Sequence, residues 1–403
     1  MKIGKLRLLF VFIMLLFVTG CSDKDNTENT EDGKVSLEEI RKEAETFSYK
    51  GTGIDVSNAD IIIPDSQTIY DLTFDLKNDS AENVEERFFE DMERYMNVSE
   101  IDKENVLYSI KLGGQNVCIP YDEVTDEEKN ITNSTLIYCD GTYSKLLYKT
   151  SNMCEMGCNT IPTELTQDTT DYSDYIWGYR GLNLGVYTKT YYIPDDDISG
   201  VSYKLYNGEV KLQDAIDYVE EHIKTDYNFA GVPYLDYKVC KVDVRRLDDT
   251  TYYYEFKVKT CYEGMAFIKD SELIMSDDNY PLVASYYVSM YEGDSLDFIR
   301  ASCYSYDNME LGKEYTEYIS LEEACRLIDK ELTNKSEFEI DSIELSYLTE
   351  YCFDPEDETG SKVDYVTCYP VYHFSVKNPG KSGYTVAYFD VKVDTGEILI
   401  TQY

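Results

Sequence analysis

Two histidines, eleven cysteines and 78 acidic residues are the side chains that could carry acid–base or nucleophilic chemistry. A histidine base needs an oriented nucleophile and an acid partner, and neither His222 nor His373 lies in a Gly-x-Ser-x-Gly, HExxH or comparable signature. The carboxylates offer every spacing, so no pair stands out for glycoside chemistry. We therefore expect both histidines to be structural or exposed, and the protein not to be an enzyme.

Metal-binding patterns are also incomplete. Cys154 and Cys158 form a CxxxC, but a zinc site needs a second ligand pair at a recognisable spacing, and the sequence offers none. The acidic runs Asp195–Asp197 and Asp354–Glu358 lack the spaced Asp-x-Asp-x-Asp-Gly loop of calcium sites. We read them as solvated turns, and we expect no metal and no cofactor.

The cysteine with the clearest chemistry is Cys21. A basic start at Lys2, Lys5 and Arg7 precedes an apolar run of about 11 residues, and Val18-Thr19-Gly20-Cys21 closes it. A membrane span needs about 20 apolar residues. The segment resembles the lipobox signal of bacterial lipoproteins; an ordinary secretory signal with an accidental cysteine is the alternative. The resemblance implies that residues 1–20 are removed, that Cys21 is acylated, and that the protein is anchored on the extracytoplasmic face of a cell membrane.

Charge limits the partners. The formal net charge is -41, which opposes nucleic acid and anionic lipid, because both need Lys and Arg to neutralise phosphate. An acidic field instead favours basic segments. Residues 22–34 carry no apolar side chain, and we expect residues 21–34 to form a flexible tether after the lipidated cysteine.

An N-terminal α+β domain is expected over residues 35–170. Ser36 and Glu39 have the spacing of a capping box at a helix start. Residues 81–96 have helical periodicity, and alternating runs predict strands at 69–76, 106–112, 135–139 and 143–148.

The C-terminal half contains an internal duplication, because residues 210–223 align without a gap with residues 319–332. Strand patterns at 254–258 and 372–376, and then at 283–293 and 386–396, follow in the same order. The ending Tyr388–Ile398 and the preceding helix resemble PepSY domains, which are non-catalytic envelope modules associated with peptidase restraint or sensing. We expect an α+β fold in which two tandem helix-on-antiparallel-sheet repeats, residues 171–308 and 309–403, follow the N-terminal domain.

Ten cysteines remain after Cys21, an even number in a compartment where disulfides persist. Cys240 and Cys261 flank the first expected hairpin, and Cys352 and Cys368 flank the second, so each pair is a candidate bridge. The apolar register, with Val242 opposite Val258, puts Cys240 and Cys261 on opposite faces unless a bulge intervenes. For Cys154 the alternatives are Cys158 and distant partners such as Cys118 or Cys139; Cys303 with Cys325 is a further pair.

An aromatic-rich segment, Tyr172–Tyr192, forms the lead-in to the first repeat. Tyr175, Trp177 and Tyr179 alternate on one face of a predicted strand. Such rings can form a ligand-binding platform, or they can pack inward as an ordinary amphipathic strand.

The sequence thus predicts a lipid-anchored lipoprotein that binds a protein or peptide and acts as a regulatory module. An envelope protein or a basic peptide is the expected partner. A solute- or glycan-capturing lipoprotein and a carboxylate-dependent envelope hydrolase are the alternatives.

Overall fold

The computed structural model describes most of the chain after residue 33. The described residues are 34–76, 85, 86, 88–90, 93, 100–112, 115–126, 134–139, 144–149, 153–159, 186–193, 196–226, 232, 234–268, 285–290, 293, 296, 298–304, 306–332, 338–353, 355, 363–377 and 386–402. The chain divides into two units, residues 1–34 and 35–403. Everything below concerns the second unit.

The elements with described bounds before residue 200 are an α-helix, a 3₁₀ turn and short to medium strands, and the described residues between 85 and 93 are helical as well. The helix is α2 (Leu37–Ala44), and the 3₁₀ turn is η1 (Lys103–Asn105). The strands are β1 (Lys34–Val35), β2 (Ile54–Asp55), β3 (Asp60–Ile62), β4 (Ile69–Leu76), β5 (Val106–Leu112), β6 (Gln115–Pro120), β7 (Ser134–Cys139), β8 (Ser144–Lys149), β9 (Met153–Asn159) and β10 (Val186–Tyr192).

Longer strands follow residue 200, together with helices α6 (Leu212–Asp226) and α7 (Leu321–Glu331). The strands are β11 (Ser202–Lys204), β12 (Glu209–Lys211), β13 (Leu235–Arg246), β14 (Tyr252–Tyr262), β15 (Met265–Ile268), β16 (Ser285–Met290), β17 (Phe298–Tyr304), β18 (Tyr306–Tyr315), β19 (Tyr318–Ile319), β20 (Phe338–Phe353), β21 (Val363–Val376), β22 (Val386–Lys392) and β23 (Ile398–Gln402).

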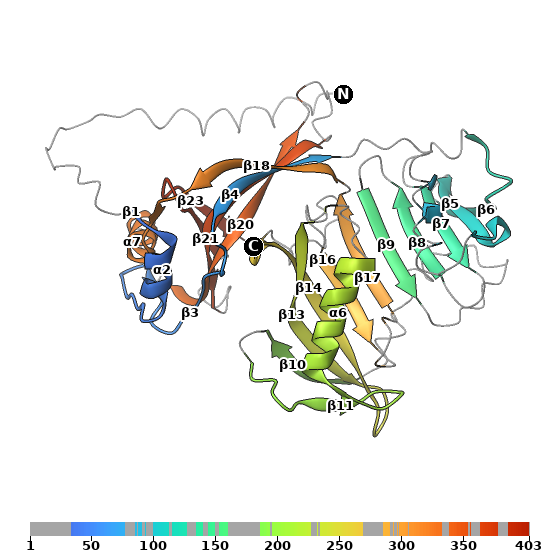
Figure 1. The fold of residues 1–403 in the computed structure, drawn as a ribbon, viewed down its shortest axis with the longest axis horizontal. Helices are drawn as coiled ribbons and strands as arrows, with labels where there is room; N and C mark the ends of the chain where they lie inside the picture. Colours follow the sequence, from blue (N-terminus) through green and yellow to red (C-terminus); the bar gives the residue numbers. More distant parts are fainter. Residues whose placement is uncertain are drawn as a thin grey trace, which may run out of the picture. The chain divides into compact units, whose positions relative to one another are not determined.

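Helix α6 packs along β13, as Figure 1 shows. Its apolar stripe is buried, and it faces the buried valines and aromatic side chains of β13 and β14. The members of the stripe are Leu212, Ala215, Ile216, Val219 and Ile223. Glu220 fixes the position of the helix, because its carboxylate accepts a hydrogen bond from the Val239 amide at 2.9 Å and pairs with Lys238 at 2.6 Å. The open side of β13 and β14 is therefore the side away from α6.

Helix α7 is held by residues from the N-terminal part of the chain. Ser320 caps its first turn, and both oxygens of Glu43 accept hydrogen bonds from the backbone amides of Leu321 and Glu322 at 3.1 and 3.0 Å. A carboxylate at this place is stabilising, since the first amides of a helix lack partners and carry partial positive charge. The same segment begins with the capping box predicted at Ser36 and Glu39, which the structure confirms.

The sheet around β20 and β21 combines distant segments. One edge of β21 pairs with β20, and its other edge pairs with β4 over residues 365–368 and with β22 over residues 371–375. The second edge of β20 pairs in turn with three short parallel strands, β2, β3 and β15, between residues 338 and 348. Strand β4 also pairs with β18.

The expected fold class is therefore wrong. The described chain is mostly β, with a large mixed sheet, and it is not an α+β fold of helix-on-antiparallel-sheet repeats. Residue periodicity shows which face of a strand is buried, but it does not show which strand is the neighbour. Here the neighbours of β20 and β21 include N-terminal strands, and three of the pairings are parallel.

Candidate functional site

Strand β10 has one buried and one open face. Tyr191 is 3% exposed, and its hydroxyl lies 3.1 Å from that of Tyr203, on the α6 side of the sheet. Because side chains alternate along a strand, Thr190 and Tyr192 lie on the opposite face. A bulge between Tyr187 and Lys189 brings Tyr187 to the same face, where its hydroxyl is 2.7 Å from that of Thr190. Tyr187 and Tyr192 are 55% and 56% exposed, so two large rings face solvent on this open face.

The charged groups of the open face come from β13 and β14 and are paired with one another. Lys241 lies opposite Tyr192 and bonds Asp243 at 2.9 Å, and Arg245 bonds Glu255. Burial opposes the charge of Lys241, but the Asp243 carboxylate outweighs it and raises the pKa of Lys241. The face thus presents exposed rings between internally neutralised charges.

The outer edge of β10 carries backbone groups that point away from β13. The Ile193 amide donates to the Cys240 carbonyl at 3.0 Å, so the backbone groups of Tyr192 and Thr190 point outward by alternation. Asp196 takes up those of Tyr192: its carboxylate accepts from the Tyr192 amide at 2.8 Å, and its own amide donates to the Tyr192 carbonyl at 2.9 Å. Among the described strands only β13 pairs with β10, so no described strand lies on the side to which the outward groups of Thr190 point.

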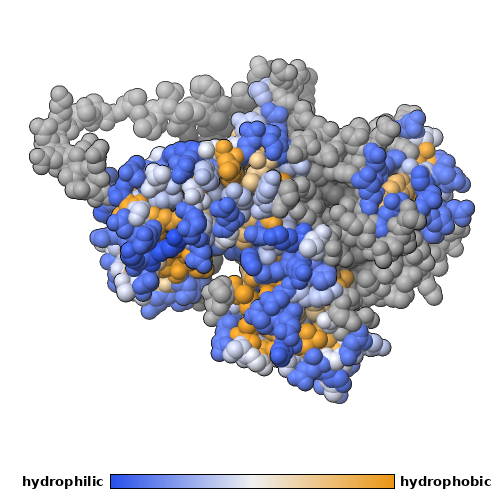
Figure 2. Space-filling view, in the orientation of Figure 1, coloured by the Kyte–Doolittle hydropathy of each residue, from blue (hydrophilic) through white to orange (hydrophobic). Residues whose placement is uncertain are grey.

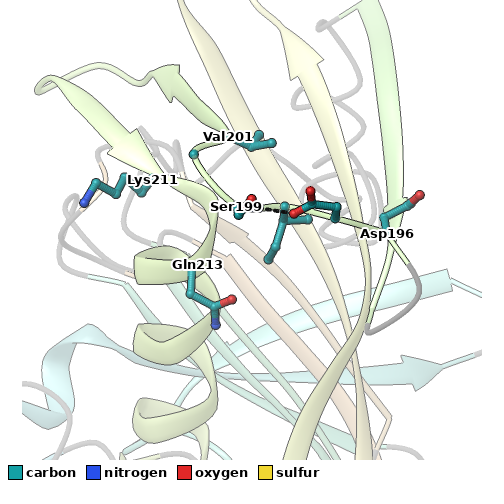
Figure 3. Close-up of a pocket in the computed structure, with 8 residues that line it drawn as sticks. Asp196, Ser199, Val201, Lys211 and Gln213 are labelled. Carbon is teal, nitrogen blue, oxygen red and sulfur yellow. Dashed lines mark hydrogen bonds between the residues drawn. The ribbon is translucent and has the colours of Figure 1, made fainter.

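A cavity of about 450 Å³ lies at the end of this edge. Its lining consists of residues 196–201, Lys211 at the end of β12 and Gln213 in the first turn of α6. In Figure 3 the side chain of Asp196 points away from Lys211 and Gln213. The Asp197 carboxylate accepts from the Ser199 amide at 2.9 Å, and hydrogen bonds from Ser199 hold the pKa of Asp197 below its usual value. Lys211 is the cationic side chain of the lining. Together with Lys211, the two acidic residues give the lining one net negative charge, which slightly favours a cationic group.

The residues predicted from the sequence as ligand-binding or lipidated lie elsewhere. Cys21, Tyr175, Trp177 and Tyr179 are outside the described residues. The acidic run read as a solvated turn does line the cavity through Asp196 and Asp197, which sequence reasoning did not select. The exposed rings of β10, Tyr187 and Tyr192, belong to the same aromatic-rich segment of the sequence as Tyr175, Trp177 and Tyr179.

The four cysteines of the expected cross-strand bridges are free thiols in the structure. The register places Cys261 opposite Asp236, four residues before Cys240, and Cys368 opposite Thr349, three residues before Cys352. The bulge that the Cys240 pairing requires is present between Val239 and Lys241, but Val242 lies opposite Phe256 instead of Val258. The offset along the strands keeps each pair of sulfurs apart.

A row of ionisable side chains extends from β14 across β20, β21 and β22. Lys259 pairs with Glu344 at 3.2 Å, His373 lies opposite Glu344 on the neighbouring strand, and the His373 Nδ1 atom is 2.6 Å from Asp390. The Ser346 hydroxyl is fully buried without a hydrogen-bond partner, two residues from Glu344. The sequence analysis did not identify this row, although Asp390, an acidic residue inside the apolar run 386–393, could have indicated a buried charge.

Two further properties can be stated for the described residues. They contain no group of three His, Cys, Asp or Glu side chains with the geometry to hold a metal ion. In the same part of the chain, every helix is too short or too polar to cross a bilayer.

Comparisons with known proteins give a distant structural likeness. No protein family model matches the chain, and no curated protein does. A crystal structure of an uncharacterized protein from Eubacterium rectale ATCC 33656 is similar, with a TM-score of 0.47 and 13% sequence identity over 88% of this chain and 92% of that chain.

Proposed function

We propose that the protein is a lipid-anchored extracytoplasmic lipoprotein that binds an extended, basic segment of a partner protein along the edge of β10. The observation that carries the proposal is the combination of outward backbone groups at Thr190, exposed rings at Tyr187 and Tyr192, and a carboxylate-lined cavity at the end of the same strand. Addition of a strand to a sheet edge gives affinity through backbone hydrogen bonds and specificity through side-chain pockets.

The edge sets the position of the added strand. Because Asp196 already bonds both outward groups of Tyr192, new backbone hydrogen bonds form at Thr190 and end before Tyr192. The bulge before Lys189 limits the pairing on the other side. A short edge with a bulge resists uncontrolled pairing between copies, and it needs side-chain contacts to hold a specific partner.

Tyrosine supplies such contacts at low entropic cost, and it is enriched where proteins bind one another. Tyr187 and Tyr192 lie on the open face beside the proposed strand. Figure 2 shows that the described surface is mostly hydrophilic in that view, with smaller hydrophobic areas. Exposed rings next to a free edge are therefore a suitable anchor.

Charge favours a basic occupant. Asp196 and Asp197 are among the residues that line the cavity, and the chain has a net charge of -41. A Lys or Arg side chain of the added strand reaches the cavity when that strand extends past Thr190. Long-range attraction also speeds association, and it weakens as salt is added.

Synthetic peptides provide a direct test. We expect blocked ten-residue peptides of alternating Lys and Val to bind the purified protein, and peptides of alternating Glu and Val not to bind. Thr190→Pro removes an outward amide without breaking the ladder to β13, and should weaken the Lys/Val peptide by about tenfold, the free energy of one hydrogen bond. The readout is the dissociation constant by biolayer interferometry.

Thr190→Ala is the matched control. It loses the hydroxyl contacts with Tyr187 and Asp243 but keeps the amide, so binding should stay within about threefold of the parent. Equal binding of the two peptide sets, no binding of either, or equal effects of the proline and alanine variants would contradict the proposed edge.

The membrane anchor is tested separately. Cys21→Ser should move the protein from the membrane fraction to the soluble fraction, and mass spectrometry of the parent protein should find Cys21 diacylated at the mature N-terminus. An unmodified Cys21 with residues 1–20 still attached refutes the lipoprotein assignment without affecting the peptide-binding result.

A further inference from the structure

Strands β9 and β17 pair in an antiparallel register without a bulge. Seven residue pairs run from Phe298 opposite Asn159 to Tyr304 opposite Met153. In this register Cys303 lies directly opposite Cys154 (Figure 1 shows the two strands). The two cysteines are 149 positions apart in the sequence, so sequence spacing gave no reason to pair them.

Directly opposed residues of an antiparallel pair have Cα atoms about 4.5 to 5.5 Å apart, depending on the hydrogen-bonding type of the pair. Disulfides span Cα separations of about 4.4 to 6.8 Å. We propose that Cys154 and Cys303 form a disulfide that joins β9 to β17.

The register also separates this pair from the other choices. Cys158, on the same strand as Cys154, lies opposite Ile299 on one side and Lys145 on the other. Cys325, a possible partner of Cys303 in the sequence reading, is fully buried on α7. The structure thus assigns a cross-strand bridge where the sequence offered a local CxxxC loop.

Bond formation is a thiol–disulfide exchange with a small disulfide such as glutathione disulfide. The thiolate of one cysteine attacks that disulfide and releases one thiol, and the second cysteine thiolate then attacks the mixed disulfide and releases the other. The two protein sulfurs lose two electrons and two protons in total, and the small disulfide is reduced to two thiols. The exchange takes place in a defined redox buffer, so its test does not rest on the proposed function.

The test is disulfide mapping of the purified full chain. The protein is equilibrated with glutathione disulfide under native conditions, alkylated with N-ethylmaleimide, and digested with trypsin without reduction. We expect peptide 150–180 to be linked to peptide 301–313 and Cys158 to be alkylated. A second digestion after Glu155 separates Cys154 from Cys158 and locates the link.

Variants provide the matched comparison. Cys154→Ser should abolish the linked peptide and leave Cys303 alkylated, whereas Cys158→Ser on the same strand should retain the link. A Cys154–Cys158 bridge, a bond from Cys303 to another cysteine, or alkylation of all three residues in the parent protein overturns the proposal, whether or not the variants fold.

Discussion

Asp329 connects helix α7 to the N-terminal part of the folded chain, and its replacement should loosen that connection. One carboxylate oxygen accepts hydrogen bonds from the backbone amides of Gly53 and Ile54 at 2.7 and 3.1 Å, and the other accepts from the Tyr49 hydroxyl at 2.5 Å. The loop also fits closely, because a Cβ atom on Gly51 would lie 1.5 Å from the same carboxylate.

The magnitude follows from the three hydrogen bonds. A hydrogen bond to a charged group contributes about 1.5 to 3 kcal/mol, and bonds that share one acceptor do not add fully. Asp329→Ala should therefore cost about 3 to 5 kcal/mol, since it leaves three donors without their partner. Asp329→Asn keeps one carbonyl oxygen and can donate to the Tyr49 hydroxyl, so its cost should be nearer to 1 to 2 kcal/mol, about the loss of the charge.

Hydrogen exchange at the Gly53 and Ile54 amides is the assay, because it reports local opening. A loss of about 3 kcal/mol corresponds to exchange more than about 100-fold faster, at about 1.4 kcal/mol per factor of ten. Glu331→Ala is the control on the same helix, at an exposed side chain. Unchanged exchange in Asp329→Ala, or equal effects of Asp329→Ala and Glu331→Ala, would refute the argument that this carboxylate holds the loop.

Two further substitutions test the packing around β4 and β22. Burial raises the pKa of Asp71, although the Tyr315 hydroxyl at 2.7 Å and Lys313 oppose this, so the ionised carboxylate destabilises the fold. That cost is absent below the unfolded-state pKa of about 3.9, grows as pH rises above it, and is complete above the higher folded-state pKa. Urea unfolding should therefore show Asp71→Asn gaining stability relative to the parent from about pH 4 upward, and a gap independent of pH would contradict this explanation. Gly396 has φ 72° and its Cβ position lies 2.5 Å from the Leu327 side chain, whereas Gly200 has φ 74° and an open Cβ position. Gly396→Ala should lower the free energy of unfolding by about 1 to 3 kcal/mol, and by more than Gly200→Ala does, unless Leu327 moves without cost.

Local patterns in the sequence predicted local structure well. The strand expected at 69–76 is β4 with the same bounds. The aligned segment 210–223 covers all but the last three residues of α6, and the segment 319–332 contains all of α7. These features depend on residues a few positions apart: caps, a two-residue alternation and a helical stripe. The described residues of the expected helix at 81–96 are helical as well, and Phe88 is buried there.

Pairing between distant strands could not be predicted in the same way. Val242 was expected opposite Val258, but the turn in which Asp248 accepts from the Thr250 and Thr251 amides sets a register in which Val242 lies opposite Phe256. The bulge beside Cys240 changes the pairing only of the residues before it. A shift of two residues keeps every side chain on its face, so hydrophobic alternation does not detect it. The edge of β10 was missed for a related reason: the sequence gives the exposed rings, but the direction of the Thr190 backbone depends on the register with β13.

The short strands β2 and β3 along the edge of β20 affect how the protein folds during synthesis. A polypeptide is made from its N-terminus, so residues 54–62 emerge nearly 280 positions before the strand that completes their hydrogen bonding. Until β20 has been synthesised, residues 54–62 have no strand to pair with, and contacts of such long sequence separation form slowly. The nascent protein must stay open and unaggregated until its last quarter arrives, and maturation should therefore be limited by the end of the chain.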